Sequence, residues 1–177
     1  MIRDYGFIEP QITEEDYTFG GGQIKSIPLT FSGQWDEYLP THEKQVKSID
    51  TQGCVTFGTL NALEILFKKR GEERNFSDRF IANLSGTTLR GNTPSKVLDT
   101  IRKKGLVSEE ILPFEYGMTW HEFYADIDRK TLREGKKFLK RYEVQHDWVF
   151  TRGADHKALQ DALSYSPVGV SVHASRS

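Results

Sequence analysis

The chain contains 177 residues, with 24 Lys and Arg against 25 Asp and Glu, which gives a formal net charge of -1. This length suits one domain or two small ones, and it is enough to bury a core without disulfide or metal support. The balanced charge argues against nucleic acid and anionic membranes as partners, and no apolar run approaches the length of a membrane-spanning helix.

The first 40 residues carry few helix signals and contain Gly20, Gly21 and Gly22 in succession. This triplet lacks the Gly-Lys-Ser/Thr that follows in a phosphate-binding loop, so we interpret it as a flexible turn. Residues 1–40 are therefore predicted to form an extended N-terminal segment.

The strongest predicted helix runs from near Gln52 to about Arg70. Asp50 or Thr51 can cap its N-terminus, and Gly71 ends it. Apolar residues cover most of its circumference, which predicts a central buried helix.

Two shorter helices are predicted next, one after Ser77 and one that begins with Thr93 and Pro94 and ends at Gly105. Residues 128–141 hold seven basic and two acidic residues, a composition typical of a solvated helix face or a linker. An anionic partner is the alternative for this segment, but no known nucleic-acid motif accompanies the charge.

Strands are predicted late in the chain, over 142–150 and 168–172, on either side of a short helix capped by Asp155. Helices first and strands late indicate an α+β fold. After the extended segment we therefore expect a helical lobe over 41–141 and the start of an incomplete β lobe over 142–177.

Cys54 lies at the start of the predicted central helix. A thiol there experiences the partial positive charge of the helix N-terminus, which lowers its pKa and favours the nucleophilic thiolate. The adjacent backbone N–H groups can stabilise an oxyanion. The alternative is an inert buried cysteine, because free cysteine is among the most buried residue types.

Cys54 is also the only cysteine of the chain, which excludes an intramolecular disulfide and a cysteine-rich zinc site. We therefore expect a reducing compartment, no metal and no cofactor. The N-terminus lacks the basic region and the apolar region of a secretory signal peptide.

The residues around Cys54 resemble the active-site helix of papain-like cysteine peptidases. In that family a Phe follows the Cys three positions later and a Glu ten positions later, and Cys54, Phe57 and Glu64 keep this spacing. Further segments resemble the family in collinear order: Asn75–Ile81, Gly91–Asn92, Gly105–Phe114 and Leu159–Val170. The resemblance covers roughly residues 35–173.

This resemblance implies a papain-like α+β fold, with a helical lobe around the Cys-bearing helix and the first strands of a β-barrel lobe. It also implies that Cys54 attacks a carbonyl of a peptide or protein substrate and forms an acyl-enzyme. Gln45 is favoured as the oxyanion-hole residue, with Gln52 as the substitute, and Gly91 and Asn92 line the substrate cleft.

The sequence also departs from the family pattern. Thr51 stands where the family carries a disulfide cysteine, and Ser48 stands at the usual place of the oxyanion Gln. The run Glu43–Gln45 after Leu39–Pro40 resembles bacterial and phage-type members, which favours its glutamine for the oxyanion hole.

Papain-like catalysis also requires a His and an Asn or Asp, which in the papain branch lie roughly 130–150 residues after the Cys. Counted from Cys54, that range lies beyond Ser177. The histidines that are present are expected to be surface or packing residues: His42, His121, His146, His156 and His173. We therefore expect a chain truncated before the catalytic pair and inactive alone, with a missing C-terminal segment or a partner covering the β lobe.

Two other classes remain open. One is a non-catalytic papain-like module with a structural or interaction role, for example in a virus particle. Together with the missing signal peptide, this gives a cytoplasmic or virion-associated location as the expectation. The other is a transglutaminase-like or amidase-type cysteine enzyme, which the Gly105–Phe114 and Pro167–Val168 segments fit less well than papain.

Overall fold

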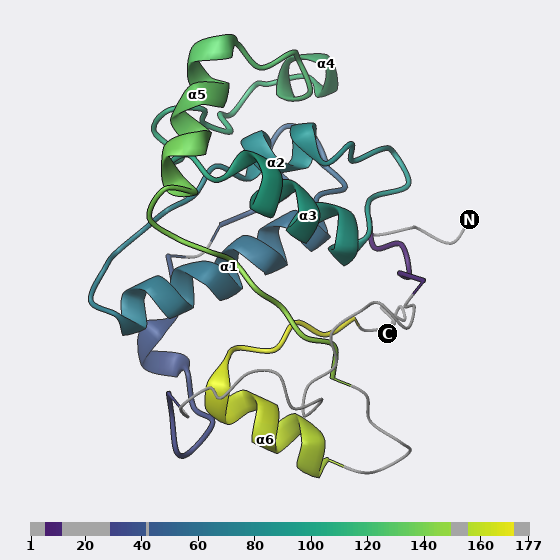
Figure 1. Ribbon diagram of the computed structural model, residues 1–177. Helices are drawn as coiled ribbons and strands as arrows, with labels where there is room; N and C mark the ends of the chain where they lie inside the picture. Colours follow the sequence, from purple (N-terminus) through teal and green to yellow (C-terminus); the bar gives the residue numbers. More distant parts are fainter. Residues whose placement is uncertain (1–5, 12–28, 42, 150–155, 172–177) are drawn as a thin grey trace.

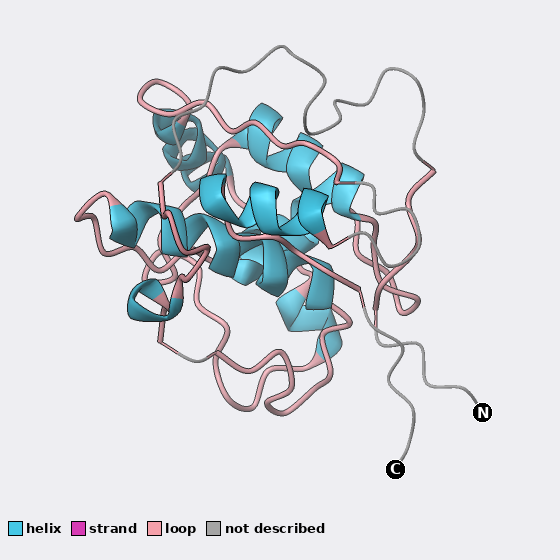
Figure 2. Ribbon diagram, turned by 90° about the horizontal axis from the view of Figure 1, so that it is seen from below, coloured by secondary structure: helices cyan, strands magenta, loops and turns pink. Residues whose placement is uncertain are grey.

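The computed structural model describes residues 6–11, 29–41, 43–149 and 156–171 (Figure 1). In these ranges the helices follow the order η1 (Asp36–Tyr38), α1 (Cys54–Lys69), α2 (Asp78–Leu84), α3 (Pro94–Lys104), α4 (Trp120–Phe123), α5 (Arg129–Phe138) and α6 (Lys157–Tyr165). The β pairing in the same ranges consists of isolated bridges, so Figure 2 shows helices joined by loops. None of the described helices is long and apolar enough to cross a membrane.

Helix α1 lies at the centre of the molecule, as predicted. In Figure 1 it crosses the middle, with α2 and α3 packed along one side and η1 on the other. The main core cluster joins α1, α2 and α3 through Val55, Leu60, Phe67, Phe80, Ile81, Val97 and Ile101. Burial of each such side chain stabilises the fold by roughly 1.5–3 kcal/mol.

The ends of α2 and α3 confirm the predicted sequence signals. Ser77 Oγ accepts a hydrogen bond from the Phe80 N–H before α2, and Thr93 Oγ1 accepts one from the Lys96 N–H before α3. Gly105 follows α3 with a φ of 76°, in the left-handed region that favours glycine.

The start of α1 differs from the prediction. The helix begins at Cys54 rather than near Gln52, and Gly53 holds the N-cap position without a side-chain cap. Gln52 has a φ of 54°, and this left-handed backbone interrupts the helix. The side chains of Asp50 and Thr51 hydrogen-bond to N–H groups within the preceding turn, so they shape that turn instead of capping α1.

The basic segment 128–141 forms α5 and packs on the core. Asp128 caps the helix by accepting hydrogen bonds from two backbone N–H groups. Phe138 is buried, with its ring centroid 5.8 Å from that of Phe76. The seven basic side chains of the segment are exposed. Of the two structures predicted for this segment, a solvated helix face or a linker, the helix face is therefore confirmed.

The strands predicted over 142–150 and 168–172 do not form in the residues described there, 142–149 and 168–171. A stable strand needs a neighbouring strand that satisfies its backbone hydrogen bonds. The bridges between described residues join other parts of the chain, so the α+β prediction is confirmed in its helical part only. Helix α6 forms where the short helix is predicted, whereas Asp155 and the Gly20–Gly22 triplet lie outside the described residues.

The early chain lies against α6. Leu29 and Thr30 donate their N–H groups to the Ser164 carbonyl at 2.8 and 3.0 Å. The indole Nε1 of Trp35 donates to the Leu163 carbonyl at 2.8 Å. Hydrogen bonds therefore join residues 29–35, just before η1, to helix α6 near the other end of the sequence.

Candidate active site

Cys54 is the first residue of α1, half-buried beside the main core cluster, and its sulfur is in no disulfide. Gly53 at the N-cap position of α1 provides no side-chain cap, and N–H groups at the start of a helix can donate to a ligand or a reacting oxygen. The N-terminus of a helix also favours a negative charge at this point. The position therefore suits a thiolate nucleophile.

The turn in front of Cys54 is held by short-range hydrogen bonds. Thr51 donates its N–H to the Gln45 carbonyl at 3.3 Å, and Thr51 Oγ1 accepts from the Gly53 N–H at 3.3 Å. Asp50 Oδ1 accepts from the Gln52 N–H at 3.1 Å. Thr51 is fully buried, so the turn is anchored in the protein interior.

Both candidate oxyanion glutamines belong to this turn. The Gln45 side-chain amide donates to Asp50 Oδ1 at 3.1 Å. The Gln52 Oε1 atom is buried, and within the described part of the chain it has no hydrogen-bond partner. The structure therefore places both Gln45 and Gln52 in the turn that precedes Cys54.

Asn92 uses its side chain inside the protein. It is 2% exposed, and its Nδ2 donates to Ser85 Oγ at 2.8 Å and to Thr87 Oγ1 at 3.1 Å. Its Oδ1 accepts from the Thr93 N–H at 2.8 Å. Only the backbone of Asn92 is therefore available to a substrate.

That backbone is occupied by the N-terminal part of the chain. The Asn92 N–H donates to the Gly6 carbonyl at 2.9 Å, and the Ile8 N–H donates to the Asn92 carbonyl at 2.8 Å. Phe7 forms a parallel bridge with Asn92. The protein's own segment 6–8 thus pairs with the predicted cleft wall through its backbone.

Gly6 is enclosed between Gln52, in the turn before Cys54, and Gly91. A Cβ atom on residue 6 would lie 2.3 Å from the Gln52 carbonyl oxygen, and one on residue 91 would lie 1.9 Å from the Gly6 carbonyl oxygen. Both glycines have positive φ values, 88° and 93°. The contact therefore requires glycine at both positions, a requirement that no local pattern in the sequence indicates.

The sequence analysis missed Tyr124, whose hydroxyl donates to the Thr51 carbonyl at 2.7 Å. Burial raises the pKa of Tyr124 well above its ordinary value, so the phenol is a neutral donor at neutral pH. Tyr124 lies 70 residues downstream of Cys54, and nothing in its local sequence connects it to the turn.

A second group of buried carboxyls lies along α1, α2 and the loop before α4. Burial raises the pKa of Glu64 to about 7 although its Oε1 accepts from the Phe76 N–H at 2.7 Å. Burial likewise raises the pKa of Glu109 to about 7, and it holds the pKa of Asp78 well above the ordinary range. These groups are therefore partly or wholly protonated near neutral pH.

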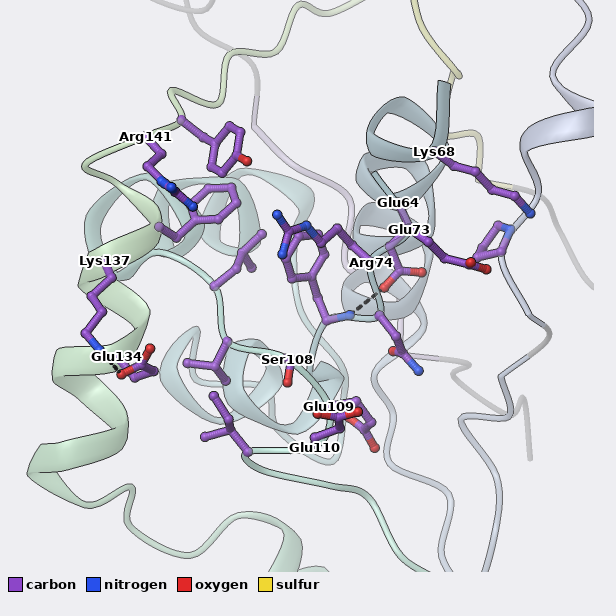
Figure 3. A pocket seen from close by; sticks show the side chains of 18 of the residues that line it. Glu64, Lys68, Glu73, Arg74, Ser108, Glu109, Glu110, Glu134, Lys137 and Arg141 are labelled. Carbon is purple, nitrogen blue, oxygen red and sulfur yellow. Dashed lines mark hydrogen bonds and ion pairs between the residues drawn. The ribbon is translucent and has the colours of Figure 1, made fainter. Parts of the chain in front are cut away.

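Glu64 and Glu109 also border a cavity of about 970 Å³ between α1, the 106–113 loop and α5 (Figure 3). Its wall combines acidic side chains with basic ones, among them Arg74 and Arg141, around Phe76 and other apolar side chains. The residues that line it do not include Cys54 or the predicted cleft residues. This cavity is separate from the candidate active site.

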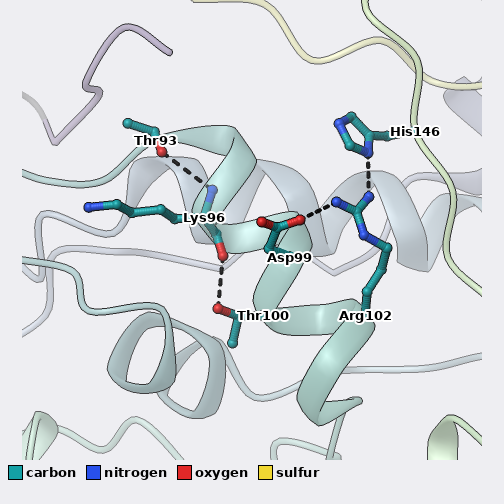
Figure 4. Close-up of polar contacts among 6 residues, drawn as sticks. All are labelled: Thr93, Lys96, Asp99, Thr100, Arg102 and His146. Carbon is teal, nitrogen blue, oxygen red and sulfur yellow. Dashed lines mark hydrogen bonds and ion pairs between the residues drawn. The ribbon is translucent and has the colours of Figure 1, made fainter. Parts of the chain in front are cut away.

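The histidines within the described ranges lie on three different elements. His121 is exposed on α4, and His156 holds the N-cap position of α6. His146 Nδ1 lies 2.6 Å from the guanidinium of Arg102, which also pairs with Asp99 on α3 (Figure 4). His42 and His173 lie outside the described residues.

No group of three or more His, Cys, Asp or Glu residues in the described ranges is arranged to hold a metal ion. The groups that the structure places in and around the turn before Cys54 are backbone N–H groups and the side-chain amides of Gln45 and Gln52.

Neither a protein-family model nor a curated protein matches the sequence. Among solved structures, the chain is similar to the proform of the cysteine protease Amb a 11, a ragweed pollen allergen. The two share 18% sequence identity with a TM-score of 0.46, and the match covers 74% of this chain and 37% of that one. It is also similar to digestive procathepsin L 3 of Tenebrio molitor larval midgut, with 18% identity, a TM-score of 0.44 and coverage of 68% and 41%. A structure from work on the mite allergens Blo t 1 and Der p 1 gives 15% identity, a TM-score of 0.40 and coverage of 59% and 36%. The chain thus spans between 36% and 41% of the length of these structures.

Proposed function

We propose that this chain is part of a papain-like cysteine peptidase, comprising its helical lobe and the start of its β lobe, with Cys54 as its nucleophile. The observation that carries the proposal is the place of Cys54, at the uncapped N-terminus of the central helix and directly after an anchored turn. The ordered sequence resemblance around Phe57 and Glu64 supports the same assignment.

In the proposed reaction, the Cys54 thiolate attacks the carbonyl carbon of a peptide bond. The carbonyl oxygen becomes an oxyanion, and we assign its stabilisation to the N–H groups at the start of α1 and to the Gln45 amide, with Gln52 as the substitute. The C–N bond then breaks, the amine leaves with a proton, and a thioester joins the acyl group to Cys54. Water hydrolyses that thioester in the second half of the reaction.

The proton must pass from the thiol to a base and on to the leaving amine. We assign this role to a His oriented by an Asn or Asp of the β lobe, outside the residues described. We therefore propose that labelling of Cys54 needs only the groups around α1, whereas turnover of peptides also needs this His.

The proposed substrate is an extended peptide that pairs its backbone with Gly91 and Asn92. Segment 6–8 supports this, because it already makes two backbone hydrogen bonds to Asn92. A substrate chain requires the same backbone N–H and carbonyl of Asn92, which we call the edge at Asn92. It therefore competes with segment 6–8 for them.

A peptidyl chloromethyl ketone tests the proposed function. We expect it to alkylate Cys54 faster than it alkylates free cysteine under the same conditions, as measured by intact mass against time. The Cys54→Ser variant controls for reaction at other side chains. Labelling of Cys54 no faster than that of free cysteine contradicts the nucleophile assignment.

The second candidate is a non-catalytic papain-like module with a structural or interaction role. The contacts of segment 6–8 with Asn92 favour it, since a peptide substrate would first have to displace this segment. The two candidates differ in their response to removal of segment 6–8: a peptidase gains access for peptide reagents, and a structural module loses only stability.

A further inference from the structure

Positive charge is concentrated in one short segment of the chain. Residues 128–141 hold seven of the 24 Lys and Arg and two of the 25 Asp and Glu, which leaves 17 basic and 23 acidic residues elsewhere. All seven basic side chains are exposed, and α5, which carries most of them, lies at the periphery of the molecule (Figure 1). A basic surface therefore stands on a chain that is otherwise net negative.

The basic residues of α5 share one face of the helix. Residues three, four or seven positions apart lie above one another on an α-helix, and five basic residues keep these spacings. They are Arg129, Lys130, Arg133, Lys136 and Lys137. The buried residues Thr131, Gly135 and Phe138 lie on the opposite face. We call the five exposed residues the α5 basic face.

These charges are not placed where they stabilise the helix. Arg129 and Lys130 stand in the first turn, where the helix dipole disfavours cations, and the acidic residue near them is the N-cap Asp128. Basic residues three or four positions apart also repel one another. Within the described part of the chain, one ion pair engages the α5 basic face, from Lys137 to Glu134 at 2.6 Å. An anionic partner would relieve the remaining repulsion.

The cavity of about 970 Å³ opens beside the α5 basic face (Figure 3). Lys137 and Phe138 of α5 line it, and Lys140 and Arg141 continue the basic wall after the helix. The wall also includes apolar side chains, among them Phe76, Leu106, Val107 and Ile111. A ligand with both carboxylates and an apolar side chain therefore finds a place for each.

The two kinds of group are separated across the cavity. Glu64 and Glu109 lie on the other side of it from α5 (Figure 3). Carboxylates of a ligand are repelled there and attracted to α5. The charges thus orient such a ligand, with its acidic groups on the α5 basic face and its apolar group in the cavity.

This arrangement favours a protein over nucleic acid or a membrane. The α5 basic face carries no aromatic side chain on which bases could stack. A helix that lies on a membrane turns its apolar residues outward, whereas Leu132 and Phe138 of α5 pack against the main core cluster. An acidic protein segment needs neither feature, and it can supply the apolar side chain for the cavity.

We propose that the α5 basic face binds an acidic segment of a partner protein, with an apolar side chain of that segment in the adjoining cavity. The residues that line the cavity do not include Cys54. This binding site therefore applies to a peptidase and to a non-catalytic module alike.

The test is the binding of a labelled peptide to the full chain, measured by fluorescence anisotropy at low salt. The probe carries a rhodamine label, a run of about six glutamates, which in extended form covers the roughly 10 Å from Arg129 to Lys136, and one phenylalanine. A peptide with glutamines instead of glutamates is the control ligand. We expect the glutamate peptide to bind at least about tenfold more tightly, with a difference that shrinks as salt screens the charges. Equal binding of the two peptides overturns the proposal.

Charge reversal at Arg133→Glu and Lys136→Glu tests the place of binding. The new carboxylates lie three or four positions from other basic residues, so we expect the variant to stay folded and to bind the glutamate peptide at least about tenfold more weakly. Lys44→Glu with Lys96→Glu is the matched control, because it makes the same change in net charge at two exposed lysines outside α5. Equal weakening by the two double variants overturns the proposal.

Further ligands test the chemistry of the partner. Exchange of the peptide's phenylalanine for alanine should weaken binding, and an unchanged affinity overturns the role of the cavity. Tighter binding of single-stranded DNA, or of vesicles made of equal parts phosphatidylcholine and phosphatidylserine, overturns the choice of an acidic protein segment. Reaction at Cys54 is not part of these measurements, so failure of the nucleophile assignment and failure of this proposal are distinguishable.

Discussion

Gly6 and Gly91 meet backbone to backbone, so closely that a Cβ atom on residue 91 would lie 1.9 Å from the Gly6 carbonyl oxygen. The contact brings the N-terminal segment onto the edge at Asn92 and closes the candidate cleft from within the same chain. The position of segment 6–8 on Asn92 thus depends on two glycines with positive φ, Gly6 and Gly91.

Gly91→Ala should therefore destabilise the protein and displace segment 6–8. The substitution adds backbone strain of about 1–3 kcal/mol at a φ of 93°, and the steric overlap with Gly6 adds to it. Gly86→Ala is the control, because its φ of 72° carries similar strain while its Cβ would meet nothing within 4 Å. Urea denaturation should show a larger loss of unfolding free energy for Gly91→Ala. Equal losses for the two variants would contradict the close packing of residues 6 and 91.

Removal of residues 1–8 should open the edge at Asn92. We expect the truncated chain to react faster with a peptidyl chloromethyl ketone, while its rate with iodoacetamide changes much less, because only the peptide reagent needs the edge. The ratio of the two rates is the measurement. A ratio equal to that of the full chain would mean that segment 6–8 and an extended peptide do not compete.

The buried carboxyls Glu64 and Glu109 predict that stability falls as the pH rises. Burial raises the pKa of both groups to about 7 in the folded protein, whereas the ordinary value of 4.5 applies in the unfolded chain. The folded state therefore binds protons more strongly, so the contribution is complete below about pH 4.5 and is lost as the pH rises through about 7. Denaturation midpoints between pH 5 and pH 8.5 check this.

Glu64→Gln should flatten that pH dependence, because a neutral amide replaces the titrating group and its oxygen can still accept from the Phe76 N–H. Glu110→Gln is the matched control, since Glu110 lines the same cavity but is exposed. A slope that Glu110→Gln reduces as much as Glu64→Gln does would contradict the role of the buried group.

Arg79 should prove far more important for stability than Arg74. Arg79 donates to the carbonyls of Phe123 and Glu122 and so fixes α4, and loss of such charged hydrogen bonds costs about 1.5–3 kcal/mol each. Arg74 pairs with Glu72 at the surface, where an ion pair contributes at most about 1 kcal/mol. Thermal unfolding of Arg79→Ala and Arg74→Ala compares them, and similar melting temperatures would contradict this difference.

Local signals allowed the sequence to predict most of the helices. The central helix followed from its apolar residues, and Ser77, Thr93 and Gly105 act at the helix ends as expected, because capping involves residues only a few positions apart. The start of α1 was predicted two residues early, since the left-handed conformation of Gln52 depends on its surroundings.

The candidate site was predictable only in part for the same physical reason. Cys54 and the two glutamines lie within one short segment, so pattern and spacing could indicate them. The contacts from Tyr124 to Thr51 and from Gly6 to Gly91 join residues that are more than 70 positions apart. Such contacts arise from the packing of α4 and of the N-terminal segment, which no local pattern specifies.

The most direct test of the nucleophile assignment uses the single thiol of the chain as its own control. The rate of Cys54 alkylation by iodoacetamide is measured at pH 6 for the folded protein and for the same chain unfolded in urea. If the start of α1 stabilises the thiolate, the folded chain reacts at least about tenfold faster, because at this pH an ordinary thiol is almost fully protonated. A folded thiol that reacts at the unfolded rate or more slowly would contradict the assignment of Cys54 as an activated nucleophile.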